Sequence, residues 1–291
     1  MSARARARRG GRTGTRQVRI GARGSEAVGV GLVLAFLALT VVGPWVAPYS
    51  PFRIDLAHEF ELPSARHWLG TTDNGVDVLS ALLYGARLSG VVAIATVGTS
   101  LLIGGALGAF AGYRGGRVDH WVTALCDLVQ AFPSIVLNVA VLALTAEPGV
   151  LHLVLALIAN GWVLFARVAR ANALVLRQAE FVQAARALGL SELTVLRKHV
   201  VPNLAGPLIV QATAALGGAV LAESTLSFLG LGPGASASWG ALLDQGSAVL
   251  LRFPHVALIA GGTIALTVYA ANRAGDYLRD RLDPRSYTRP R

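Results

Sequence analysis

Charged residues are scarce in this sequence of 291 residues: they make up 14% of it, against about 25% in a typical soluble domain. Cysteine is scarcer still. Cys126 stands alone, which excludes a disulfide framework and a cysteine-based metal site. Hydrophobic residues account for 54% of the chain, and the mean hydropathy is +0.55. So few charged side chains cannot cover a water-facing surface, and the composition therefore excludes a soluble enzyme.

The parts of a catalytic site are also missing. The only lysine, Lys198, follows an arginine, so the Gly-Lys pair of a phosphate-binding GxxxxGK[ST] loop is absent. Residues 58–62 (His-Glu-Phe-Glu-Leu) begin like a zinc-protease HExxH helix but end in leucine, so the second histidine ligand is missing. We therefore expect no enzymatic activity, no metal and no cofactor, and an ATP-driven process would need a separate ATPase subunit.

Long apolar stretches are what the sequence does contain. A helix needs about 20 mostly apolar residues to cross the hydrocarbon of a bilayer. The stretches between consecutive charges predict helices near residues 27–47, 88–112, 121–146, 149–170, 204–229 and 255–275. We therefore expect an all-α integral membrane protein with six transmembrane helices, surrounded by the lipid bilayer.

The basic residues are distributed unevenly around these spans. The N-terminal tail, residues 1–25, carries eight arginines. If this tail is cytoplasmic, 22 of the 26 basic residues lie on the cytoplasmic side, which is the positive-inside signature. Both termini, including a second tail at 277–291, are thus predicted to be cytoplasmic in a multi-pass protein of the cytoplasmic (inner) membrane.

Two other interpretations of the basic N-terminus are a cleaved signal peptide and a nucleic-acid-binding segment. The apolar run of the first membrane segment, 26–48, is longer than a typical signal-peptide core, and Pro48 follows the only plausible cleavage position, Ala47. An arginine-rich stretch beside a span is more simply an orientation signal, so no nucleic-acid partner is expected.

Two segments outside the membrane are long enough to have a function. The external loop covers residues 49–85, and its last part, 76–84, has the apolar spacing of a helix lying along the membrane surface. That helix is either a docking face for a soluble partner or an ordinary lead-in to the next span, and composition does not separate the two.

The internal segment, residues 171–203, contains two short amphipathic stretches joined at Gly189. Ser191 is a good N-cap for the second stretch, and Pro202 is predicted to end it. A helix–glycine–helix unit held between two spans is suited to pushing against another protein. The alternative is an amphipathic loop that lies on the membrane surface.

Asp127 and Glu223 are the two carboxylates at membrane depth. Such residues line a solute path or relay protons, which makes a proton-coupled carrier the second candidate class. The alternative is local pairing, favoured for Asp127 and open for Glu223, whose neighbours Ser224, Thr225 and Ser227 offer hydroxyl groups.

Gly104, Gly108 and Gly112 recur every four residues on the second predicted helix. A face without Cβ atoms lets another helix approach closely, so this stripe is predicted to pack against a helix of the same chain or of a partner.

The internal segment resembles a known pattern. Residues 183–189 (Gln-Ala-Ala-Arg-Ala-Leu-Gly) and 199–203 (His-Val-Val-Pro-Asn) resemble the EAA loop of binding-protein-dependent ABC importer permeases. Further stretches are similar to the dipeptide, oligopeptide and nickel branch of these permeases: 67–71, 77–80, 83–87, 111–116, 131–133, 221–232, 238–240 and 275–280.

The resemblance implies a type I ABC importer permease bundle over residues 86–276. It implies a second, homologous permease in a heterodimeric pore, two cytoplasmic ATPase subunits and an extracytoplasmic solute-binding protein. The coupling (EAA) loop would present Glu180, Gln183, Ala184, Ala185, Gly189, His199 and Pro202 to the ATPase.

The cargo implied by the resemblance is a di- or oligopeptide, with nickel complexes, glutathione and other small solutes as alternatives. Gln183 stands where the family usually has glutamate, so an ion pair at that position becomes a neutral hydrogen bond, and Glu180 is a candidate substitute.

Overall fold

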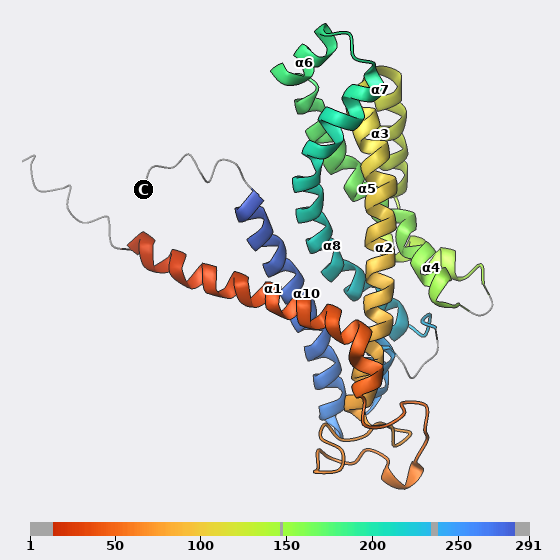
Figure 1. Ribbon diagram of the computed structural model, residues 1–291. Helices are drawn as coiled ribbons and strands as arrows, with labels where there is room; N and C mark the ends of the chain where they lie inside the picture. The colour runs from red at the N-terminus through yellow and green to blue at the C-terminus, as the bar shows by residue number, and fades with distance from the viewer. Residues whose placement is uncertain (1–13, 146–147, 234–237, 283–291) are drawn as a thin grey trace, which may run out of the picture.

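The computed structural model describes residues 14–145, 148–233 and 238–282, and its regular elements in these ranges are helices (Figure 1). The prediction of an all-α protein is therefore confirmed. In chain order the elements are α1 Gly14–Val46, the 3-10 turn η1 Leu56–His58, α2 Val78–Arg114, α3 Gly116–Gln130, α4 Ser134–Leu142, α5 Val150–Leu176, α6 Glu180–Ala187, α7 Glu192–Val195, the π-turn η2 Leu196–Val200, α8 Val201–Phe228, α9 Trp239–Ala248 and α10 Pro254–Leu282.

Five helical segments in the described part are long and apolar enough to cross a membrane, and a sixth span is broken. The broken span lies where the sequence predicted one helix at 121–146, and its two parts, α3 and α4, are bent by 81° relative to each other. Pro133 stands directly before α4, and its ring nitrogen has no hydrogen to continue the α3 hydrogen-bond ladder. The six-span prediction holds when this bent pair is counted as one span.

Helix α2 is central to the bundle and packs against α1, α5 and α8. Its contact with α5 is the closest of these. A Cβ atom on Gly104, Gly108 or Gly112 would lie within 2.5 Å of a carbonyl oxygen of α5. The predicted glycine stripe therefore packs against a helix of the same chain, and glycine is needed there because the two backbones touch.

The surface helix predicted over residues 76–84 is wrong. Residues 78–84 form the first turns of α2, and the Asp77 carboxylate caps this helix by accepting a hydrogen bond from the Ser80 backbone N–H at 2.8 Å. Val78, Ala81 and Leu82 are buried in the bundle. The predicted helix is present, but its apolar face packs against other helices and does not lie on lipid.

The external loop folds back over the end of the bundle. His67 contributes Nδ1 to a buried pair with the Asp77 carboxylate at 3.0 Å, which ties the loop to the start of α2. Phe60 stacks on Phe253, just before α10, with ring centroids 4.7 Å apart.

Pro202 does not end the second amphipathic stretch, as the sequence predicted. Helical structure runs without interruption from Glu192 to Phe228 through α7, η2 and α8. The π-turn η2 precedes the proline, and the side-chain amide of Asn203 donates to the His199 carbonyl at 2.6 Å. The wider turn and this side-chain bond accommodate a proline that would otherwise break the helix.

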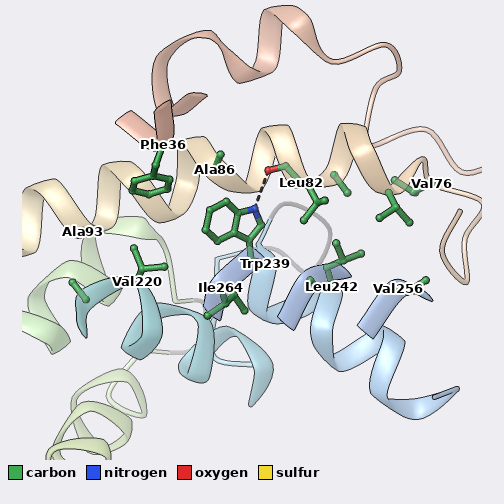
Figure 2. Packing of buried hydrophobic residues seen from close by; sticks show 14 of the residues in the cluster. Phe36, Val76, Leu82, Ala86, Ala93, Val220, Trp239, Leu242, Val256 and Ile264 are labelled. Atoms are coloured by element: carbon green, nitrogen blue, oxygen red, sulfur yellow. Dashed lines mark hydrogen bonds between the residues drawn. The ribbon is translucent and has the colours of Figure 1, made fainter. Parts of the chain in front are cut away.

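Helix α9 was not expected from the sequence. After α8 ends at a glycine in the left-handed region (Gly230, φ 76°), the chain re-enters the bundle with α9. Trp239, its first residue, is 3% exposed and donates its indole N–H to the Leu82 carbonyl at 2.9 Å (Figure 2). The same ring lies 5.6 Å from that of Phe36, so it joins α1, α2 and α9.

Candidate functional site

The predicted coupling loop is a folded helix–turn–helix at one end of the bundle, shown at the top of Figure 1. Its turn is a Schellman motif. Gly189 has φ 81°, its N–H bonds to the Arg186 carbonyl at 2.9 Å, and the Leu190 N–H bonds to the Ala185 carbonyl at 3.3 Å. Ser191 caps α7 by accepting from the Thr194 backbone N–H at 3.3 Å, as predicted.

The two alanines of the EAA pattern face opposite ways. Ala185 is buried with Val182 in a cluster that also contains Tyr113 from α2 and Val200 from η2. Ala184 is exposed. The buried face anchors α6 to the ends of the spans, and the other face is open to solvent.

Large apolar side chains are exposed on the open face of the unit. Phe181, Leu188 and Leu193 are exposed, and Leu188 keeps 82% of its surface accessible. Exposed apolar side chains on a folded, anchored unit outside the membrane are typical of a protein-binding surface.

Arg186 fixes this unit to α2, and the sequence analysis missed it. Its guanidinium lies 4.9 Å from the centre of the Tyr113 ring, donates to the Tyr113 hydroxyl at 3.3 Å and contacts Glu192 at 3.4 Å. The hydrogen bond to Tyr113 raises the pKa of Arg186 above its usual value, so the group stays charged. The separation of 73 residues between Arg186 and Tyr113 hid the contact from sequence reasoning.

The other polar residues predicted for the coupling loop lie at different positions on the unit. Gln183 is exposed and its amide donates to the Arg177 carbonyl at 3.2 Å, and Glu180 is exposed in the first turn of α6. His199 lies in η2, half-buried, with its ring 6.5 Å from that of Phe181. This hydrogen bond of Gln183 stays within the chain.

Asp127 is paired with a cation. The Arg167 guanidinium on α5 donates to its carboxylate at 2.7 Å, and the side chains of Asp127 and Arg167 are 62% and 47% exposed. A second ion pair of the same kind joins Asp119 of α3 to Arg170 of α5. These ion pairs connect α3 to α5. The paired residues lie far apart in the sequence, so sequence reasoning could not pair them.

Glu223 is fully buried, with 0% of its surface exposed. Its carboxylate oxygens lie within hydrogen-bond distance of four serine hydroxyls: Ser89 at 2.6 Å, Ser227 at 2.9 Å, Ser238 at 3.1 Å and Ser224 at 3.3 Å. The sequence offered Ser224, Thr225 and Ser227 as candidate partners for local pairing, and the structure pairs Glu223 with Ser224 and Ser227. The contribution of Ser89 and Ser238, which come from outside α8, was not foreseen, and Thr225 instead donates to the Leu221 carbonyl.

A cavity of about 590 Å³ lies between α8 and α10. It is lined mainly by apolar side chains, and Ser224, Thr225, Tyr269 and Asn272 supply the polar groups. Ser224 therefore touches both the cavity and Glu223, whereas Glu223 itself is enclosed behind the cavity wall.

No group of three histidine, cysteine, aspartate or glutamate side chains with metal-binding geometry occurs among residues 14–145, 148–233 and 238–282. The polar clusters of this part of the chain are ion pairs and hydroxyl networks.

The chain is similar to known permeases along most of its length. It is 35% identical over 259 residues to the dipeptide transport system permease protein DppC of Alkalihalophilus pseudofirmus, covering 89% of this chain and 85% of that protein. It is 36% identical over 262 residues to the glutathione transport system permease protein GsiD of Pectobacterium atrosepticum, covering 89% and 87%. It is 34% identical over 259 residues to the oligopeptide transport system permease protein OppC of Bacillus subtilis, covering 89% and 85%.

The fold is similar to that of a solved transporter. A chain of the MetNI methionine ABC transporter, in an inward-facing conformation, superposes with a TM-score of 0.59 at 18% identity, covering 70% of this chain and 96% of that one. The family described as binding-protein-dependent transport system inner membrane component matches residues 104–286, which include the coupling loop, Glu223 and the cavity. The chain belongs to this family, and it is a multi-pass permease component of an ABC transport system with the type I importer fold.

Proposed function

We propose that this chain is one half of the pore of an ATP-driven importer of di- or oligopeptides, and that two ATPase subunits dock on the helix–turn–helix of residues 180–195. The observation that carries the proposal is the geometry of that unit: an exposed apolar face on a buried, hydrogen-bonded base. A surface-lying membrane loop needs no such base, because lipid alone would cover its apolar face.

The proposed coupling depends on the continuity of the chain beyond this unit. The ATPase-facing turn at Gly189 is followed by one helical segment, Glu192–Phe228, that reaches deep into the bundle. A displacement of the docked unit by ATPase closure therefore moves the inner end of α8 directly.

The second permease of the proposed heterodimer would cover the face formed by α8 and α10. Leu221, Leu266 and Tyr269 are exposed on these helices, around the apolar cavity. The cavity then becomes a space between two subunits, on the solute path. Both termini lie in the cytoplasm in this arrangement, on the side of the coupling unit, and a solute-binding protein docks on the opposite side.

A peptide cargo is supported by the similar permeases, which belong to dipeptide, oligopeptide and glutathione transport systems. Glutathione is itself a small peptide derivative, so the shared chemistry is a peptide backbone. Nickel complexes are the alternative cargo, and ATP-dependent uptake of nickel without uptake of peptides would replace this part of the proposal.

The test is co-purification of the chain from its native membrane in mild detergent, with matched variants at the two ends of the bundle. Leu188→Asp places a charge on the proposed docking face, and Leu62→Asp places one on an equally apolar, 66% exposed position of the external loop. We expect the first variant to lose at least nine-tenths of the ATPase subunits that accompany the wild type, and the second to keep them. Equal retention by both variants, or solute movement by the purified chain alone in liposomes without ATP, would refute the proposal and favour a carrier.

A further inference from the structure

Glu223 occupies the far end of the helical segment that begins in the coupling unit. The segment Glu192–Phe228 has 37 residues, which corresponds to about 55 Å of helix. Glu223 lies in the last two turns of this segment, where α8 meets α2 and α9. Whatever holds this carboxylate therefore holds the end of the helix opposite to the coupling unit.

The carboxylate is held by hydroxyls alone among the described residues. Oε2 accepts from Ser89 and Ser224, and Oε1 accepts from Ser227 and Ser238. Two of these donors, Ser224 and Ser227, belong to α8 itself. Ser89 belongs to α2, and Ser238 is the N-cap of α9, so these two bonds join α8 to other elements.

The bond from Ser238 reaches the backbone of α9. The Ser238 hydroxyl accepts a hydrogen bond from the Gly240 N–H at 3.1 Å while it donates to Glu223. An N–H at the start of a helix carries partial positive charge, so this relay favours donation from the Ser238 hydroxyl to the Glu223 carboxylate. A Cβ atom on Gly240 would lie 2.0 Å from the Ser224 carbonyl oxygen, which shows that the two backbones are in contact.

The first turn of α9 is also bound on its other side. Trp239 donates to the Leu82 carbonyl of α2 and lies against Phe36 of α1, as Figure 2 shows. A small movement of Glu223 must therefore pull Ser238 and α9 with it, or break buried hydrogen bonds and leave buried polar groups unpaired.

We propose that Glu223 is a positioning residue that links the far end of α8 to α9, so that movement of the coupling unit is transmitted to the opposite end of the bundle through the Glu223–Ser238 hydrogen bond. This inference rests on the proposed function. It requires that a donor on another element, Ser238, matters more than an equivalent donor on α8 itself.

The four serines supply matched variants for the test. Ser227→Ala and Ser238→Ala each remove one hydroxyl from the same carboxylate oxygen, but of these two hydrogen bonds only that of Ser238 joins α8 to α9. Glu223→Gln keeps the shape of the side chain and removes its charge. Each variant is assembled with the partner subunits in nanodiscs, and ATP hydrolysis is measured in parallel to show that the complex is intact.

The readout is the reactivity of a cysteine on α9 toward a membrane-impermeant thiol reagent. Asp244 is exposed on α9, so Asp244→Cys is introduced in a background in which buried Cys126 is replaced by alanine. In the otherwise unchanged complex we expect at least a fivefold change in reactivity between the nucleotide-free state and the state trapped with ATP and vanadate. With Ser238→Ala or Glu223→Gln this change falls below twofold while ATP hydrolysis continues, and with Ser227→Ala it is retained.

Equal responses of Ser227→Ala and Ser238→Ala would overturn the inference, because the hydroxyls would then only satisfy a buried charge. If Glu223→Gln fails to assemble, the serine pair still decides the question. A wild-type complex that binds no ATPase would contradict the proposed function itself, which keeps the two failures distinguishable.

Discussion

The two ends of α8 are built in different ways. At the coupling end, an exposed apolar face rests on a small buried cluster, and its turn is fixed by local hydrogen bonds around Gly189. At the opposite end, near Glu223, side chains from α1, α2, α8 and α9 converge on buried bonds. The coupling end exposes a surface that another protein can cover, whereas the Glu223 end buries its polar groups among helices of this chain.

This difference indicates how stability and function are divided between the two ends. Substitutions on the open face of the coupling end change little buried surface, so they affect partner binding more than folding. Substitutions at the Glu223 end remove buried contacts that several helices share, so they destabilise the bundle. This difference in stability effects is best tested with pairs of residues of the same type, one buried near Glu223 and one exposed elsewhere.

Tryptophan provides the largest expected effect. Trp239→Ala leaves a cavity among α1, α2 and α9 and removes the indole hydrogen bond to the Leu82 carbonyl, and such changes in a core cost about 3–5 kcal/mol. We expect little folded protein to survive in detergent, as measured by size-exclusion chromatography after a temperature ramp. Trp121→Ala, at a position that is 67% exposed on α3, is the control and is expected to behave like the wild type. Similar losses for both variants would show that the Glu223 end is not specially constrained.

The sequence anticipated the coupling end because its signals are local. Gly189 and Ser191 lie two residues apart, and the apolar spacing on either side of them describes the two short helices without reference to the rest of the chain. The same reasoning failed at Pro202, where the π-turn η2 and the Asn203 side chain let the helix continue.

The Glu223 end could not be derived in that way. Ser89 and Glu223 are separated by 134 residues, so only the folded chain brings them together. Helix α9 was missed because its ten residues are too few to span a membrane and were assigned to a connection. The bend between α3 and α4 had a visible cause in Pro133, but its angle of 81° depends on packing that a sequence does not display.

The close α2–α5 contact gives an intermediate effect. Gly108→Ala places a Cβ atom 2.1 Å from the Ala166 carbonyl oxygen, so the helices must separate at a cost of about 1–3 kcal/mol. Gly98→Ala on the same helix meets nothing within 4 Å and is expected to be neutral or to stabilise the protein by about 0.5–1 kcal/mol. The thermal unfolding temperature in detergent should therefore fall for Gly108→Ala and stay unchanged or rise for Gly98→Ala. A shared direction would mean that helix propensity, and not close packing, decides the outcome at Gly108.

The smallest expected effect tests whether Arg186 helps to anchor the coupling end to α2. Arg186→Met keeps much of the side-chain volume but removes the hydrogen bond to Tyr113 and the attraction to its ring, at a cost of about 1 kcal/mol. The exposed Arg197 provides the control, because Arg197→Met changes the same charge without a Tyr113 contact to lose. We expect the melting temperature to fall by about 2–4 °C for the first variant and to stay unchanged for the second.

The Arg186 variant should also retain fewer ATPase subunits, because α6 is then held to α2 by apolar contacts alone and its exposed face is less well ordered for docking. Loss of stability with full ATPase retention would show that the buried cluster positions the docking face without help from Arg186, and would make the two ends of α8 still more different in design.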